Sequence, residues 1–172
     1  MKKILTPHIL FAAAAISALG LPVSASAADE ARAVVTFQDP EKFTDIKDTA
    51  SGTDKGREFY LKELRTLVEK QADVLLPEGQ KLEMTFTDID LAGDYLPMMA
   101  SGHDVRVMKD IYRPAMKFSY KITDASGAVV KEGTENISDI NYLNTIGTLV
   151  GRGEALYYDK GLLLDWLRKT LR

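Results

Sequence analysis

The chain has 172 residues, of which 22 are basic, 25 acidic, two histidine and none cysteine. Its length predicts one domain, and its 45% apolar and 27% charged residues are typical of an ordinary globular protein. The absence of cysteine excludes disulfide frameworks, zinc ribbons, thiolate nucleophiles, iron–sulfur clusters and the acylated cysteine of a lipoprotein.

The first 27 residues have the pattern of a secretory signal peptide. Lys2 and Lys3 form a positive n-region, the apolar stretch Ile9–Leu21 follows, and Ala25-Ser26-Ala27 supplies the small residues that signal peptidase requires. The stretch is shorter than the roughly 20 residues of a spanning helix, so we favour cleavage after Ala27 over an uncleaved membrane anchor. We therefore expect residues 28–172 to form a single soluble domain, periplasmic or secreted, without a membrane span.

Cleavage changes the charge of the chain. Without Lys2 and Lys3, 20 basic residues face 25 acidic ones, and the net charge becomes about −5. An acidic chain without a basic block is a poor candidate for nucleic-acid binding, because that affinity depends mainly on neutralising phosphates. Cleavage also removes His8, which leaves His103 as the only histidine.

Two β-prone runs are predicted in the first half of the mature chain. Residues 33–37 form a short apolar run, and residues 38–54 after it are polar and irregular, with several turn-forming residues. In residues 81–86, apolar and polar side chains alternate, which is typical of a half-buried strand.

A long helix is predicted between these two runs. From Tyr60 to Leu75, apolar residues recur at spacings of one, three and four, which places them on one side of a helix. Thr53 or Asp54 is suited to cap its start, and Pro77 ends it.

The second half of the mature chain predicts further strands and a last helix. Val105 and Val107 indicate a short edge strand after a connection over residues 93–104. Residues 116–122 alternate again, and the turn at residues 124–127 leads into a return strand through Val129 and Val130. The final helix places its apolar residues on one side: Leu162, Leu163, Trp166, Leu167 and Leu171.

This order of elements predicts an α+β fold. The economical packing is a two-layer sandwich in which a mostly antiparallel sheet of about four strands has the long helix and the C-terminal helix on one face.

An acidic cluster is the first candidate for chemistry, because oxygen ligands suit calcium or magnesium. A calcium loop that begins at Asp88 would have Ala92 at its fifth position and Met99 at its twelfth. Neither side chain supplies an oxygen ligand, so the cluster does not fit this motif. In a regular strand the Asp88 side chain would point to the same side as the buried residues before it. Three arrangements avoid burying the carboxylate: the strand ends there, the strand bulges there, or the carboxylates lie at the rim of the core. The alternative is a turn in which the aspartates cap backbone donors. The candidate metal ligands are Asp88, Asp90, Asp104 and His103.

His103 restricts the enzymology, because every histidine base or imidazole ligand must be this one ring. It lies in a Ser-Gly-His-Asp loop and is more simply a solvated side chain. With Met98 and Met99 it would offer soft ligands for copper(I), although methionines also fill gaps in a core. Gly151-Arg152-Gly153 lacks the ending of a phosphate loop and is interpreted as a hinge.

Four cationic residues fall within twelve positions. They indicate either a stripe that binds an anionic partner of the cell envelope or, as we favour, a solvated strand edge that discourages sheet pairing. These candidate partner-binding residues are Arg106, Lys109, Arg113 and Lys117.

Four segments spread over the mature chain are distinctive. Their sequences are VTFQDPEKFTD (residues 35–45), FTDIDLAG (86–93), DVRVMKD (104–110) and LLLDW (162–166). In these segments the chain resembles Domain of Unknown Function 3016, a family of exported bacterial proteins. The resemblance implies secretion and a single domain, and it transfers no catalytic residue, cofactor or substrate.

The sequence favours a non-enzymatic module of the cell envelope that binds a protein or a glycan, because no recognised catalytic motif is present. The alternative is a metal-dependent hydrolase or metal carrier built on Asp88, Asp90, Asp104 and His103. The sequence identifies no cofactor, no particular partner and no oligomeric state.

Overall fold

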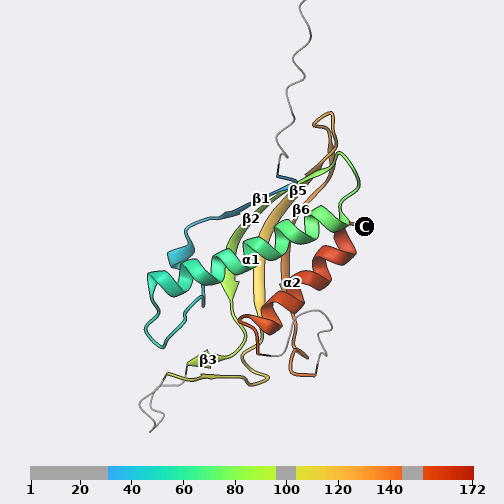
Figure 1. Cartoon of the computed structure of the whole chain (residues 1–172). Coiled ribbons are helices and arrows are strands. Elements are labelled where there is room, and N and C mark those ends of the chain that lie inside the picture. Colours follow the sequence, from blue (N-terminus) through green and yellow to red (C-terminus); the bar gives the residue numbers. More distant parts are fainter. Residues whose placement is uncertain (1–30, 96–103, 145–152) are drawn as a thin grey trace, which may run out of the picture. The chain divides into compact units, whose positions relative to one another are not determined.

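The computed structural model of the protein describes residues 31–95, 104–144 and 153–172. The expected signal peptide, the Met98–Met99 pair and His103 lie outside these residues, as do Gly151 and Arg152. In chain order the elements are β1 (Ala33–Phe37), the 3-10 turn η1 (Pro40–Lys42), α1 (Asp54–Leu75), β2 (Lys81–Asp90), β3 (Asp94–Tyr95), β4 (Arg106–Val107), β5 (Ala115–Thr123), β6 (Val129–Ser138) and α2 (Tyr157–Thr170) (Figure 1).

Four strands form the main sheet in the order β1-β2-β5-β6. The β1–β2 pair is parallel and needs a crossover connection, which α1 provides, whereas β2–β5 and β5–β6 are antiparallel. Both helices lie on the same face of this sheet (Figure 1). The predicted α+β fold, with a mostly antiparallel four-stranded sheet and two helices on one face, is confirmed. The short strand expected near Val105 does form, but β4 pairs with β3 in a separate two-stranded sheet.

The core lies between the sheet and the two helices. The helix-facing side chains of β2 and β5 are buried, and those of the opposite face are mostly polar. Burial of each large apolar side chain contributes about 1.5–3 kcal/mol, so this alternation fixes which face the helices cover. Trp166 of α2 packs edge-on against Phe118 and Tyr120 of β5, with ring centroids 4.7 and 5.0 Å away.

A bulge in β2 resolves the problem that Asp88 poses for a regular strand. Phe86 lies opposite Phe118, but the next paired residue is Asp88, opposite Lys117, so Thr87 is the extra residue. As a result Phe86 and Ile89 are both fully buried, while Asp88 lies beside Lys117 on the helix-free face. Of the options left open by the sequence, the bulge is the one observed.

The long helix begins where Thr53 caps it. The Thr53 Oγ1 accepts a hydrogen bond from the Gly56 N–H at 2.9 Å, so Thr53 rather than Asp54 is the cap. In the described part of the chain, no helix has both the length and the apolar character needed to cross a membrane.

Candidate binding site

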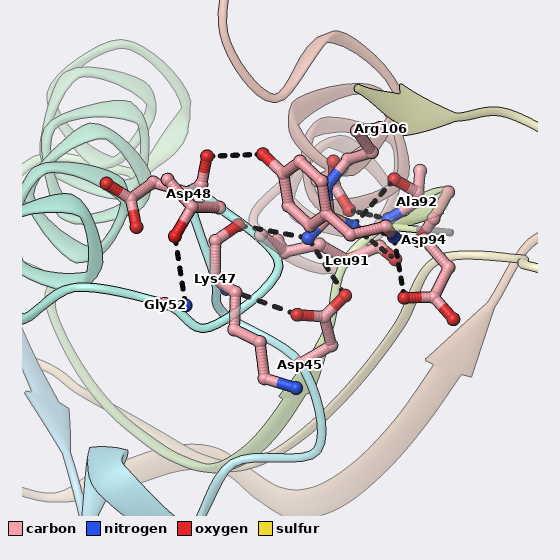
Figure 2. A network of polar contacts seen from close by, with 12 residues as sticks. Asp45, Lys47, Asp48, Gly52, Leu91, Ala92, Asp94 and Arg106 are labelled. Atoms are coloured by element: carbon pink, nitrogen blue, oxygen red, sulfur yellow. Dashed lines mark hydrogen bonds and ion pairs between the residues drawn. The ribbon is translucent and has the colours of Figure 1, made fainter. Parts of the chain in front are cut away.

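A buried arginine holds several segments together at the end of the sheet where β2 finishes (Figure 2). Arg106 Nη1 donates to the carbonyl oxygens of Ala92 and Gly93, at 3.1 and 2.8 Å. Its Nη2 donates to Asp45 Oδ2 at 2.9 Å and to the Lys47 carbonyl oxygen at 3.0 Å. The Arg106 and Asp45 side chains are 13% and 12% exposed, so this ion pair is largely shielded from water.

Asp45 reaches the arginine because the chain before it runs alongside the end of β2. The Asp45 N–H donates to the Ile89 carbonyl at 3.0 Å, and the Leu91 N–H donates to the Asp45 carbonyl at 3.1 Å. Phe43 and Ile46 on either side are buried and fix this segment to the core. No strand forms between residues 38 and 53, as expected for an irregular segment, but a single parallel bridge joins Asp45 to Asp90.

Tyr95 extends this network to the start of α1. The Arg106 guanidinium lies 4.8 Å from the centre of the Tyr95 ring, within the range of a cation–π contact. The Tyr95 hydroxyl donates to the Asp48 carbonyl, and the Asp48 carboxylate accepts from the Thr53 N–H and hydroxyl. The capped end of α1 is thus connected to Arg106 through one tyrosine.

A buried carboxylate joins α2 to the same place. Asp159, in the first turn of α2, accepts the Ala92 N–H at 2.9 Å. Burial raises its pKa from 3.8 to about 6, while the Ala92 donor and the charge of Arg106 oppose that rise. Next to it, Lys160 pairs with Glu63 of α1 at 2.6 Å. The first turn of α2 is therefore fixed both to the segment after β2 and to α1.

A cavity of about 470 Å³ lies beside these contacts. Its most prominent feature is a set of four tyrosines from three elements: Tyr60 of α1, Tyr95 of β3, and Tyr157 and Tyr158 of α2. Asp159 and Arg106 contribute to its wall, with Glu154 and apolar side chains completing it: Leu91, Met108, Leu143 and Leu156. It combines flat aromatic surfaces with a small number of charged groups, which is typical of small-ligand sites.

A second cavity of about 450 Å³, which we call the acidic cavity, also borders Leu91 and has three carboxylates in its wall. Asp45, Asp90 and Asp94 line it together with Lys47 and Arg113. Burial raises the pKa of Asp90, and the nearby charge of Asp45 adds to that effect.

The described candidate metal ligands Asp88, Asp90 and Asp104 are not grouped as a metal site. Asp88 accepts hydrogen bonds from Thr44 and Lys117, and although burial opposes the effect, these contacts lower its pKa. Asp104 accepts the Ala50 N–H at 3.1 Å, and His103 lies outside the described residues. Within residues 31–95, 104–144 and 153–172, no three acidic or histidine side chains are grouped as metal ligands.

The four candidate partner-binding cations have different environments. Arg106 is engaged in the network above, and Lys109 and Arg113 are exposed between β4 and β5. Lys117 lies on β5, an internal strand, and pairs with Asp88 at 2.9 Å. The interpretation of these residues as one strand edge was therefore wrong, because the chain turns between Arg106 and Lys117.

Sequence reasoning missed Asp45, Tyr95 and Asp159 of the polar network, and Tyr157 and Tyr158 of the cavity wall. Asp45 ends the segment VTFQDPEKFTD, to which the sequence analysis attached no chemical role, and Tyr95 and Asp159 lie outside the four distinctive segments. The partners of Asp45, Tyr95 and Asp159 lie between 47 and 67 positions away in the chain. The only local signal was the apolar pair Phe43 and Ile46 within a polar stretch.

The comparisons with known proteins identify a family without an assigned activity. The comparisons with curated proteins and with solved structures found no significant match. A family model described as "Protein of unknown function (DUF3016)" matches residues 31–169, which include all four segments on which the resemblance was based. The chain therefore belongs to the DUF3016 family.

Proposed function

We propose that the protein is a non-enzymatic binding module of the bacterial cell envelope and that the tyrosine-lined cavity binds a sugar ring of an envelope glycan. The observation on which this proposal rests is the convergence of four tyrosines and a buried carboxylate on one cavity of about 470 Å³. Export of residues 28–172 after cleavage near Ala27 is part of the same proposal and rests on the sequence pattern.

The chemistry of the wall favours a sugar ring over a purely apolar ligand. A tyrosine offers a flat apolar face together with a hydroxyl that forms hydrogen bonds. A sugar ring has the complementary character, because its C–H groups form apolar faces and its hydroxyls both donate and accept. The Asp159 and Glu154 side chains supply oxygen acceptors among these rings.

The size of the cavity supports a small ligand. Ligand sites usually occupy about 300–1,000 Å³. At about 470 Å³, this cavity is large enough for a monosaccharide unit and part of its neighbour, so a glycan would enter by one or two rings.

The Arg106 network supports binding without a large rearrangement. Its guanidinium fixes residues 45–47 and 92–93, and Asp159 fixes the first turn of α2. A wall assembled before the ligand arrives loses less conformational entropy on binding. The acidic net charge disfavours a nucleic-acid partner, in agreement with a neutral ligand.

The test is calorimetric titration of the purified protein with the β-1,4-linked disaccharide of N-acetylglucosamine. We expect saturable binding that Tyr158→Leu weakens about tenfold, because an aromatic contact contributes about 0.5–1.5 kcal/mol. Tyr158→Phe keeps the ring and should bind within a few-fold of the unmodified protein.

Tyr112→Leu is the matched control, since Tyr112 lines the acidic cavity and not the tyrosine-lined one. Thermal unfolding of each variant separates loss of binding from loss of the fold. Absence of binding by the unmodified protein, or equal weakening by Tyr112→Leu and Tyr158→Leu, would refute the proposal.

A further inference from the structure

We propose that the exposed edge of β6 pairs with β6 of a second copy of the chain, antiparallel and centred on Gly133. The pairing would join two four-stranded sheets into one sheet of eight strands. This inference concerns self-association and does not depend on the tyrosine-lined cavity.

The two edges of the sheet are unequal. β1 has five residues and β6 has ten. Among the described residues, the only strand that pairs with β6 is β5. An edge strand presents a row of unpaired N–H and C=O groups to which another strand can add. β6 contains no proline, so nothing in its covalent structure interrupts that row.

The hydrogen bonds to β5 show which residues face outward. The Asp139 N–H donates to the Pro114 carbonyl, and the same register pairs Gly133 with Tyr120. Because alternate residues of a strand bond to opposite neighbours, odd-numbered residues in this part of β6 bond to β5. Glu132 and Thr134 therefore direct their backbone groups toward the free edge.

When the pair is centred on Gly133, the outward-facing backbone groups can form hydrogen bonds and the charged side chains meet opposite charges. Glu132 of one copy then lies opposite Thr134 of the other, so outward-facing backbone groups meet. Lys131 of one copy lies opposite Glu135 of the other, and the two-fold axis repeats this pair. These are non-hydrogen-bonded positions, where opposing side chains are closest.

The neighbouring registers fit less well. A shift of two residues in one direction places Glu132 of one copy opposite Glu132 of the other, and these two carboxylates repel each other. A shift of two in the other direction pairs Lys131 with Ile137 and loses both ion pairs. Charged residues on an edge strand usually prevent association, but here their order makes the strand complementary to itself in one register.

The side chains involved are available for this contact. Lys131 is exposed, and its Nζ is 3.4 Å from the Thr170 carbonyl oxygen, which is long for a hydrogen bond. Glu135 is half-buried and lies on the same face of β6 as Lys131. A modest rotation of Lys131 toward Glu135 of the second copy breaks only that long contact.

The test is analytical ultracentrifugation of the purified protein and three charge variants. We expect a reversible dimer for the unmodified protein. Lys131→Glu replaces two attractive pairs by two repulsive ones and should weaken association about tenfold or more. Combining Lys131→Glu with Glu135→Lys exchanges the charges and should restore the dimer.

Glu132→Lys is the matched control, because Glu132 lies on the same strand but faces Thr134 in the proposed register and should leave the dimer intact. Circular dichroism checks that each variant is folded. A monomer at high protein concentration overturns the proposal, and so does failure of the charge exchange to restore association in a folded double variant.

Discussion

The two ends of the sheet are built around an aspartate in very different ways. At the β5–β6 turn, the Asp124 carboxylate accepts hydrogen bonds from Ser126 and Ala128, which are two and four residues away. At the other end, Asp45 accepts from Arg106, 61 residues away. The first end is a local turn that its own sequence specifies, whereas the second exists only when distant segments have come together.

This difference favours the second end for the proposed binding site. A local turn orders a few residues and remains exposed. The Arg106 end brings together the starts of both helices and the segments that follow β1 and β2, and the tyrosine-lined cavity lies among them. We therefore expect binding where contacts between distant segments create a concave surface.

The largest expected effect is on Arg106. Arg106→Ala removes the charged partner of the Asp45 carboxylate, which keeps only the Lys47 N–H, and also takes a side-chain donor from the Ala92, Gly93 and Lys47 carbonyls. The free energy of unfolding should fall by about 3–5 kcal/mol. Urea unfolding measures the loss. Asp124→Ala at the opposite end should lower the free energy of unfolding far less, because this turn is exposed and water can bind the N–H groups that Asp124 accepts from. Equal losses for the two variants would contradict the distinction between the ends.

Alanine substitutions at two glycines, one at each end, allow a comparison in which the backbone conformation is nearly the same. Gly93 has φ of 78° and Gly127 has φ of 82°, so alanine should cost about 1–2 kcal/mol at either position. A Cβ at Gly93 would lie 2.6 Å from Met108 Sδ and 2.9 Å from the Val107 carbonyl oxygen, whereas at Gly127 no atom lies within 4 Å. Gly93→Ala should therefore cost about 1–3 kcal/mol more than Gly127→Ala. Denaturant unfolding of both variants tests this, and equal losses would show that the Arg106 end is loosely packed.

A further effect concerns pH, and it has opposite signs at the two ends. The folded pKa of Asp159 is about 6 against 3.8 ordinarily, so the folded state binds this proton more tightly than the unfolded chain. The contribution of Asp159 to the free energy of unfolding therefore falls as pH rises from about 4 to about 6. The raised pKa of Asp90 acts in the same direction. Hydrogen bonds from Ser126 lower the pKa of Asp124, so its contribution is instead lost on acidification below about 4.

Asp159→Asn isolates this effect, because the asparagine oxygen still accepts the Ala92 N–H. We expect the variant to show a flatter dependence of unfolding free energy on pH between about 4 and 6. Urea titrations at several pH values provide the measurement. An unchanged slope would mean that Asp159 titrates normally and is not buried in the folded protein.

The comparison also defines what the sequence could predict. The four strands of the main sheet, both helices and the turn at residues 124–127 were predicted, with Thr53 as one of two candidate caps, because each depends on neighbours within a few positions. β3 was not predicted, because residues 93–104 were expected to form a connection. The bulge was one of several options for Asp88, since the sequence shows the conflict but not its resolution.

The candidate site was not predictable in the same way. Arg106 was grouped with Lys117 because they are close in sequence, yet one pairs with Asp45 and the other with Asp88. Asp45 ends one of the four distinctive segments and Asp159 lies outside them, but in neither case does the local sequence reveal the partner, which is determined by the packing of distant segments. The composition excludes cysteine chemistry, but it could not identify which tyrosines line the same cavity.

The most direct test of this account is to map ligand contacts by NMR. Backbone amide spectra of the purified protein would be recorded with increasing amounts of the β-1,4-linked disaccharide of N-acetylglucosamine. We expect saturable shifts at Ala92, Tyr158 and Asp159, with the amides of the turn at residues 124–127 unchanged. Shifts confined to other surfaces, or none at saturating disaccharide, would contradict the assignment of the tyrosine-lined cavity as the binding site.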